Sequence, residues 1–245
     1  MIEKEIEIKM ADGVCDAVLY QADDGRRLPG VIDMPDIFGI RPASRGESRR
    51  LAASGYTVLQ PNPFYRTSRS PVFSFEPDFH DERTMKRFGE LTASLTPEAM
   101  ESDGAAFVNF LAVQKTVSDA SMGIVGHCFT CASAMRAAAA RPDRIGAVAC
   151  FHGGRLFLDT PTSPHLSLPR ISAQLYFGHA TDDKSMPKEA IVKFEAALAA
   201  WGGKYESKTY DAGHGWTVPD SHAYDKAEAD RAFEKMTALF ASALK

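Results

Sequence analysis

The stretch "GIVGHCFTCASAM", from Gly123 to Met135, decides the fold prediction. Its first half is a β-branched, apolar run that predicts a buried strand, and its alanine-rich second half predicts a helix. The turn between them carries Cys128, and Gly126 permits the close backbone approach that such a turn needs. The helix N-terminus behind the thiol favours negative charge, whether on a thiolate or on a developing oxyanion. The stretch therefore predicts a strand, a sharp turn with an activated cysteine, and a helix.

Strands and helices alternate along the rest of the chain. "EIEIKMADGVCDAVLY" predicts a hairpin that turns at Asp12-Gly13, with Ile6, Ile8 and Met10 on one face. Further strands are predicted in "LPGVIDMP", "GYTVLQPNP", "SMGIVG", "IGAVACFHGG", "AQLYFGHA" and "YESKTYDAG", with helices over 43–54, from 98 onward, over 131–141 and 187–201, and at the C-terminal end. A polar, aromatic segment from Tyr65 to Thr96 interrupts this pattern. The alternation predicts an α/β fold with a mostly parallel sheet covered on both faces, in a single domain over residues 1–245.

Composition limits the function classes. The chain has 245 residues, 44% of them hydrophobic, which is enough for one large domain with a substantial core. A net charge of −4 and the lack of a dense basic run argue against nucleic-acid binding, so we expect a small-molecule partner. No run has the length of a membrane span and the N-terminus lacks a signal-peptide core, so we expect no membrane association and a cytoplasmic location. The four cysteines show no zinc-type pairing with histidines and are expected to be free thiols.

Four segments that follow strands carry the residues of a candidate active site. They are "PDIFG" after the third strand, "GHCFT" after the fifth, "GHATDDKSMP" after the seventh and "DAGHGW" after the eighth. In parallel sheets, sites gather at the carboxyl ends of the strands. The order nucleophile, acid, histidine is that of the α/β-hydrolase triad. We expect Cys128 to be the nucleophile, His214 to move the proton and Asp183 to hold the imidazole tautomer.

Two backbone N–H groups, those of Ile37 and Phe129, are expected to form the oxyanion hole, because one lies in the "PDIFG" loop and the other follows the nucleophile. Asp182 competes with Asp183 for the role of the acid, and the spacing of Asp183 to the helix-starting Pro187 favours Asp183.

The remaining cysteines and histidines near the strand ends are not expected to take part in the triad. Cys131 and Cys150 are expected to be small core residues, and His127 is expected to pack or to contact substrate rather than act as a base. His152 and His179 lie near strand ends and could line a pocket.

The chain resembles the dienelactone hydrolases, or carboxymethylenebutenolidases, over nearly its whole length. The resemblance is carried by "DIFGI", "GYTVLQPNPFYR", "DERTMKRF", "GIVGHCFT", "GHATDDKSMP" and "YDAGHGW" in combination. It implies an α/β-hydrolase fold and a triad at Cys128, His214 and Asp183. It also implies hydrolysis of an unsaturated lactone in the degradation of aromatic compounds, without a metal or organic cofactor. The sequence leaves the oligomeric state open between a monomer and a small homo-oligomer.

Three positions bear on the substrate and on the thiol. The resemblance places a carboxylate-binding arginine at Arg83, because a guanidinium forms a bidentate pair with a carboxylate; Arg66, Arg69 and Arg87 are its rivals. The same "HDERTMKR" run is also typical of a solvated helix face. Family members commonly have "QEIFG" where this chain has Asp36 in "PDIFG", and that acid is thought to control ionisation of the thiol. Because aspartate is one methylene shorter than glutamate, Asp36 is expected to couple only weakly to the thiol, through a water or by turning toward Arg41 or Arg45. Thr130 replaces the usual second glycine of the turn.

Two other functions remain open at the level of sequence. The same triad could hydrolyse neutral carboxyl esters or phosphotriesters, because a thiolate and an oxyanion hole serve several electrophiles. Alternatively, Cys128 could be a redox-reactive thiol on an inherited scaffold. The presence of both His214 and Asp183 favours hydrolysis, because a sensor thiol needs no orienting acid.

Overall fold

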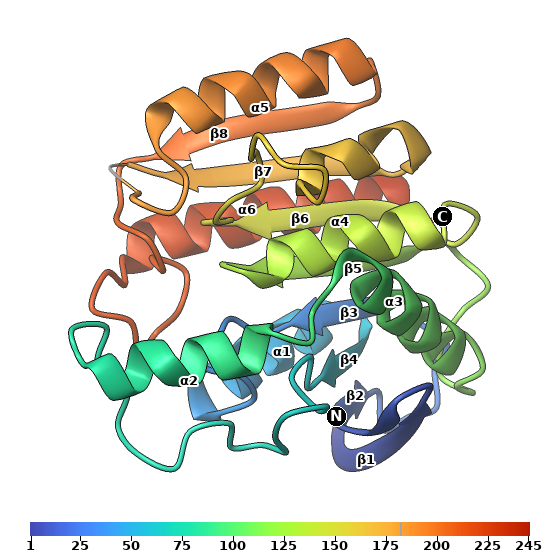
Figure 1. The fold of residues 1–245 in the computed structure, drawn as a ribbon. Coiled ribbons are helices and arrows are strands. Elements are labelled where there is room, and N and C mark those ends of the chain that lie inside the picture. The colour runs from blue at the N-terminus through green and yellow to red at the C-terminus, as the bar shows by residue number, and fades with distance from the viewer. Residues whose placement is uncertain (182) are drawn as a thin grey trace.

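An eight-stranded sheet forms the centre of the computed structural model, which describes residues 1–181 and 183–245 (Figure 1). The strands are β1 (Ile2–Met10), β2 (Gly13–Gln21), β3 (Gly30–Met34), β4 (Thr57–Pro61), β5 (Met122–His127), β6 (Ile145–Phe151), β7 (Gln174–Ala180) and β8 (Tyr205–Tyr210). Their spatial order is β1-β2-β4-β3-β5-β6-β7-β8. Only β1 with β2 and β2 with β4 pair antiparallel; the strands from β4 to β8 run parallel. The predicted fold class, a mostly parallel sheet in an α/β chain, is confirmed.

Helices cover both faces of this sheet. They are α1 (Pro42–Ala53), α2 (Glu82–Thr92), α3 (Pro97–Ala112), α4 (Thr130–Ala140), α5 (Lys188–Trp201) and α6 (Lys226–Ala243), with a 3₁₀ helix η1 (Pro164–Arg170). Figure 1 shows α3, α4 and α5 in front of the sheet and α1 and α6 behind it. Each face has its own apolar core, with Phe107, Cys131 and Phe194 in the first and Leu51 and Phe240 in the second. The two layers follow from strands that are apolar on both sides.

Most predicted elements are present with boundaries within a residue or two. The predicted hairpin is β1–β2, with Ile8 and Met10 buried. The helix α2 lies inside the polar, aromatic segment for which no element was proposed. Its start is explained by Asp81, whose side chain accepts a hydrogen bond from the Arg83 N–H and so caps the helix. None of the described residues belongs to a helix long and apolar enough to cross a membrane.

Candidate active site

Cys128 lies on a strained turn between β5 and α4. Its φ is 56°, in the left-handed region that L-residues rarely adopt, and its N–H donates to the Phe151 carbonyl at 3.0 Å. A Cβ added at Gly126 would lie 2.7 Å from the Cys131 Cα and 2.9 Å from the Thr130 carbonyl oxygen. Because these neighbours are backbone atoms, only glycine fits at position 126. The turn therefore fixes the direction of the Cys128 side chain.

Thr130 holds the same turn from inside. Its Oγ1 accepts from the His127 N–H at 3.0 Å and lies 2.9 Å from the His127 carbonyl and 3.0 Å from the Met34 carbonyl. Thr130 is fully buried. The residue that replaces the usual glycine thus connects the turn to the end of β3.

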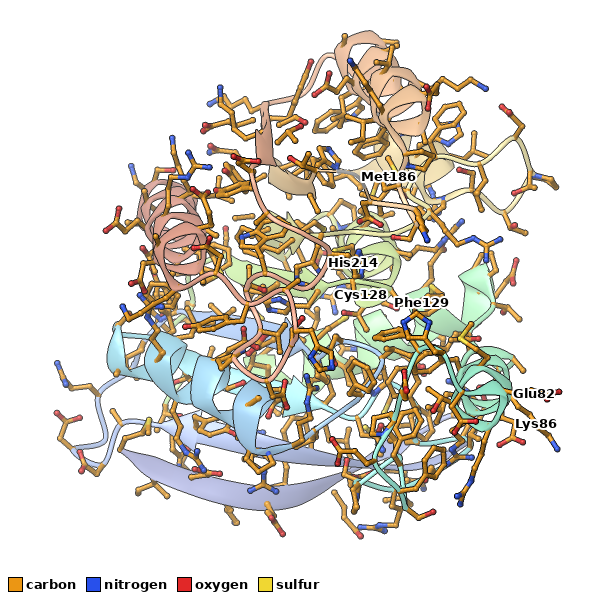
Figure 2. The ribbon with its side chains drawn as sticks, turned by 90° about the vertical axis from the view of Figure 1, so that its left-hand side faces the viewer. Glu82, Lys86, Cys128, Phe129, Met186 and His214 are labelled. Carbon is orange, nitrogen blue, oxygen red and sulfur yellow. The ribbon has the colours of Figure 1, made fainter. Side chains whose placement is uncertain are left out.

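Cys128, His214 and Asp183 meet at the carboxyl edge of the sheet. His214, on the loop after β8, has Nε2 3.0 Å from the Cys128 Sγ and Nδ1 2.6 Å from Oδ2 of Asp183, which lies on the loop after β7. Figure 2 shows Cys128 and His214 side by side, with Met186 nearby. The rival acid, Asp182, lies outside the described residues. One imidazole therefore contacts both a thiol and a carboxylate, an arrangement suited to proton transfer from a nucleophile.

At this site, burial and the neighbouring charges shift the pKa values of His214 and Asp183 in opposite directions. Burial alone would lower the pKa of His214, but its hydrogen bonds with Asp183 and Cys128, and the charges of these two groups, raise the pKa to about 10. Burial likewise works to raise the pKa of Asp183, yet its hydrogen bonds with His214 and Ser185 and the His214 charge hold it below the ordinary value of 3.8. The arrangement favours an imidazolium paired with a carboxylate.

Ser185 is a residue that the sequence analysis missed. Its Oγ donates to Oδ1 of Asp183 at 2.6 Å, its N–H donates to the same oxygen at 2.8 Å, and its Oγ lies 3.3 Å from His214 Nδ1. The signal available in the sequence is a serine two residues after the acid, a spacing typical of an Asx turn. Ser185 thereby fixes the Asp183 carboxyl in the orientation that meets His214.

The two residues expected to form the oxyanion hole belong to one apolar cluster next to the turn. Phe129 directly precedes α4, and Ile37 lies on the loop after β3. Neither backbone N–H donates to an acceptor within residues 1–181 or 183–245. Both donors are therefore available to a ligand.

Asp36 points to an arginine. Its two carboxylate oxygens accept from Arg41 at 2.7 and 2.9 Å, and Arg41 also donates to both oxygens of Asp220 at 2.8 Å. The Arg41 and Asp36 side chains are 16% and 8% exposed, so this bidentate pair is largely shielded from water. No hydrogen bond joins Asp36 to Cys128 within the part of the chain that the structure describes. Arg41 instead links the loop after β3 to the loop that follows His214.

The four candidate arginines differ in their partners. Arg66 pairs with Asp12 and Asp103, Arg69 with Glu7, and Arg87 with Glu90. Arg83, on α2, is exposed and lies 3.8 Å from the centre of the Phe75 ring, with no acidic partner among the described residues. Of the four, only Arg83 has a charge that no carboxylate already balances. Contact between Arg83 and the candidate triad is not formed in this structure.

The remaining histidines lie behind or beside the triad. The buried His127 is the last residue of β5 and pairs with Asp33 of β3 at 3.4 Å, rather than with Cys128 on the turn that follows. His152 has a positive φ of 41°, and its Nε2 forms a hydrogen bond with Thr217 Oγ1 at 2.9 Å. Its ring meets the His214 ring edge-on, with ring centroids 5.0 Å apart. His179 is buried with neither ring nitrogen hydrogen-bonded to a described residue.

The cysteines outside the triad lie in the core. Cys15, Cys131 and Cys150 are buried, and all four cysteines are free thiols, as predicted. Within the described residues, no group of three or more His, Cys, Asp or Glu side chains could hold a metal ion.

The known proteins to which this chain is similar point to one family. The model of the dienelactone hydrolase family matches residues 15–244. A Salmonella typhi protein named as a proposed carboxymethylenebutenolidase is 29% identical over 90% of this chain and 79% of its own length. A solved structure from Klebsiella pneumoniae, described as a proposed dienelactone hydrolase, is 23% identical with a TM-score of 0.84 and covers 98% of both chains. A dienelactone hydrolase-like promiscuous phosphotriesterase from metagenomic libraries is 18% identical with a TM-score of 0.81, over 100% of this chain and 99% of the other.

Proposed function

Because this chain belongs to the dienelactone hydrolase family, whose members hydrolyse ester bonds, we propose that it cleaves a lactone or carboxyl ester through a Cys128-His214-Asp183 triad. The observation that carries the proposal is the bridging imidazole, 3.0 Å from the Cys128 sulfur and 2.6 Å from the Asp183 carboxylate. A thiol that serves only as a redox sensor needs no such orienting acid. The redox alternative therefore leaves Asp183 and Ser185 without a role.

The mechanism follows from the positions of these groups. Cys128 gives its Sγ proton to His214 Nε2, and the sulfur attacks the carbonyl carbon while the Ile37 and Phe129 N–H groups donate to the oxyanion. His214 Nε2 delivers this proton to the leaving alkoxide as the C–O bond breaks, and a thioester forms on Cys128. A water molecule then gives a proton to His214 as it attacks the thioester; the C–S bond breaks, His214 returns the proton to the departing sulfur, and the carboxylic acid is released. Asp183 keeps the Nδ1 proton in place during both halves.

The substrate class rests on what lies beside the oxyanion loop. Four phenylalanine rings, which we call the phenylalanine wall, pack with centroids 5.3–5.9 Å apart; they are Phe38, Phe73, Phe79 and Phe88. Phe38, Phe73 and Phe88 of this wall belong to the apolar cluster that includes Ile37 and Phe129. Flat, unsaturated acyl groups suit such a surface. A carboxylated dienelactone would place its ring here and its carboxylate at the unbalanced charge of Arg83.

Three thiol variants test the mechanism. Cys128→Ala is expected to abolish hydrolysis of p-nitrophenyl acetate and of a carboxylated dienelactone. Cys131→Ala and Cys150→Ala, the matched controls, should keep most of the activity because their sulfurs lie in the core. Full activity in Cys128→Ala would refute the proposed nucleophile.

The substrate class needs a separate comparison. Arg83→Gln should raise KM for the carboxylated lactone by about tenfold while leaving the neutral ester unchanged, because a guanidinium–carboxylate pair contributes about 1.4 kcal/mol or more. Arg69→Gln is the control, since Arg69 already pairs with Glu7. Equal kcat/KM for a carboxylated lactone and a neutral ester would identify a general carboxylesterase. Preferential turnover of a phosphotriester would replace the lactone as the substrate.

A further inference from the structure

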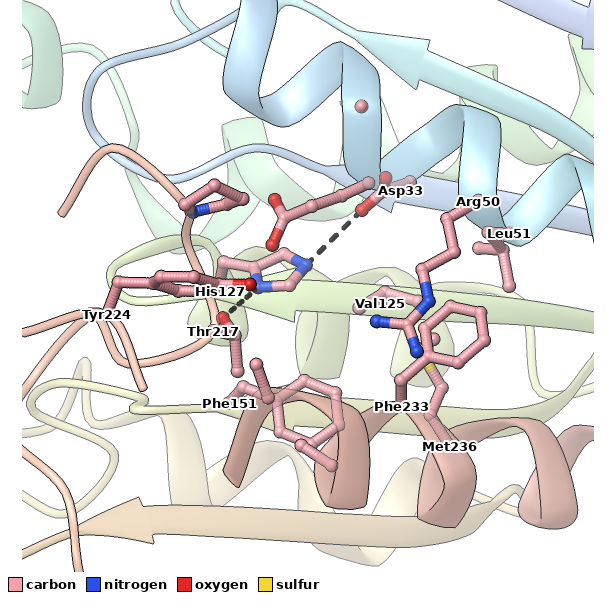
Figure 3. A pocket seen from close by; sticks show the side chains of 15 residues that line it. Asp33, Arg50, Leu51, Val125, His127, Phe151, Thr217, Tyr224, Phe233 and Met236 are labelled. Atoms are coloured by element: carbon pink, nitrogen blue, oxygen red, sulfur yellow. Dashed lines mark hydrogen bonds and ion pairs between the residues drawn. The ribbon is translucent and has the colours of Figure 1, made fainter. Parts of the chain in front are cut away.

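A second pocket lies behind the sheet, away from the candidate triad. It has a volume of about 300 Å³ and is enclosed by α1, α6, the ends of β3, β5 and β6, and the loop after β8 (Figure 3). None of Cys128, His214 and Asp183 lines it. This volume is at the small end of the range for pockets that bind small molecules. The pocket, which we call the rear pocket, has no role in the proposed hydrolysis.

One end of the rear pocket is polar, but most of its polar atoms are already paired. Asp33 accepts from Ser48 Oγ at 2.6 Å and lies 3.4 Å from His127 Nε2. The other ring nitrogen of His127 lies 3.4 Å from Thr217 Oγ1, as Figure 3 shows. Both nitrogens of His127 are thus engaged, and no N–H of this ring points to a ligand.

Glu47 is the exception at this end. It lines the rear pocket from α1, and its carboxyl has no hydrogen bond or ion pair within residues 1–181 and 183–245. Burial raises its pKa to about 8; the charge of His127 opposes the shift, and those of Asp33 and Asp36 add to it. Glu47 is half-buried, and a cation placed beside its unpaired carboxylate would stabilise the ionised form.

The opposite wall is mainly apolar. It is formed mainly by Leu51, Val125, Phe151, Tyr224, Phe233 and Met236. Arg50 lies 3.8 Å from the centre of the Phe233 ring and pairs with Asp230 at 2.8 Å, and Asp230 also pairs with Lys226 at 2.6 Å. The Glu47 carboxyl is therefore an unpaired acceptor that faces a mainly aromatic surface.

We propose that the rear pocket binds a small organic ammonium compound, with its N–H groups donating to the Glu47 carboxylate and its apolar body against Phe151, Phe233 and Met236. An anion is disfavoured beside Glu47 because the Asp33 and Asp36 carboxylates already act on this end of the pocket. A metal ion is disfavoured because the acidic and histidine side chains here do not form a ligand cluster. An ammonium group also meets favourable π-faces on the aromatic wall.

Calorimetry with three ligands that share one body tests the head group. 2-Phenylethylamine should bind at pH 8 at least ten times more tightly than 2-phenylethanol or phenylacetate. Glu47→Gln should weaken amine binding at least tenfold, whereas Glu234→Gln, an exposed position on α6, should leave it unchanged. Equal or tighter binding of the alcohol or the anion, or full amine affinity in Glu47→Gln, would overturn the proposal.

The release of a proton on amine binding is a second measurement, and a purely structural role of Glu47 would not produce it. The charged and titratable groups around Glu47 are His127 from β5, Asp33 from β3, Asp36 from the loop after β3, Arg41 and Arg50 from α1, and Tyr224 from the loop after β8. At pH 6.5 Glu47 is mostly protonated, so binding of the ammonium should release up to one proton, measured in two buffers of different ionisation enthalpy. Glu47→Gln should release none. Cys128→Ala protein should bind the amine as the parent does, which separates this result from the outcome of the hydrolysis experiments.

Discussion

At the scale of single residues, the Asp183 carboxylate carries the largest consequence for catalysis. Asp183→Asn removes the acceptor that orients His214 and raises its pKa, so kcat should fall by about 10³–10⁴ while the fold persists. Ser185→Ala leaves the carboxylate in place and should cost about tenfold or less. Steady-state kinetics and thermal unfolding of both variants provide the measurements. A larger loss in Asp182→Asn than in Asp183→Asn would move the acid to the neighbouring position.

The ion pair of Asp36 is a second test at this scale. Asp36→Asn leaves Arg41 without its buried partner and should lower the free energy of unfolding by about 2–4 kcal/mol. Asp220→Asn, whose side chain is 49% exposed, should cost about 1 kcal/mol or less. Denaturant unfolding compares the two. A negligible cost in Asp36→Asn would show that Asp36 does not hold Arg41 and is free to act on the Cys128 thiol.

At the scale of the element, the start of α4 depends on one hydroxyl. Thr130→Val keeps the shape of the side chain but leaves the buried His127 N–H without its acceptor, and should destabilise the protein by about 1–3 kcal/mol. Ser133→Ala, on the same helix, removes a buried hydroxyl that has no hydrogen-bond partner among the described residues and should be neutral or stabilising. Thermal unfolding of the two variants makes the comparison. The reverse order would mean that the turn is held by its backbone alone.

At the scale of the whole molecule, two buried histidines predict sensitivity to acid. Burial lowers the pKa of His179 to about 4, and burial lowers that of His152 as well. Below pH 6.5 the unfolded chain binds protons that the folded protein excludes, so stability falls as the pH drops from 6.5 towards 4. His179→Leu should remove about 2 kcal/mol of the stability difference between pH 7 and pH 5. Denaturant unfolding at both pH values checks this, and an unchanged difference would exclude His179 as a source.

Much of this architecture could be predicted from the sequence, because it depends on chain order and local pattern. The strand ends that carry Cys128, Asp183 and His214 are adjacent once the sheet is parallel. Contacts that join distant loops could not be predicted. Arg41 meets Asp220 across 179 residues, and nothing in either segment specifies that contact. The contact between Asp36 and Arg41 is local, and the sequence offers it as one of the alternatives for Asp36. The rear pocket depends on how α1 and α6 pack, and Glu47 has no distinguishing local pattern.

The segment between β4 and α2, residues 62–81, has a consequence for how such an enzyme changes its specificity. It adds no strand to the sheet, yet it supplies Phe73 and Phe79 of the phenylalanine wall beside the oxyanion loop. The candidate triad comes from other loops, after β5, β7 and β8. Substitutions in residues 62–81 can therefore alter which acyl groups are accepted while the nucleophile keeps its geometry. Under selection for a new ester, adaptive mutations should accumulate in this segment first, and exchange of the segment between relatives should transfer substrate preference together with it.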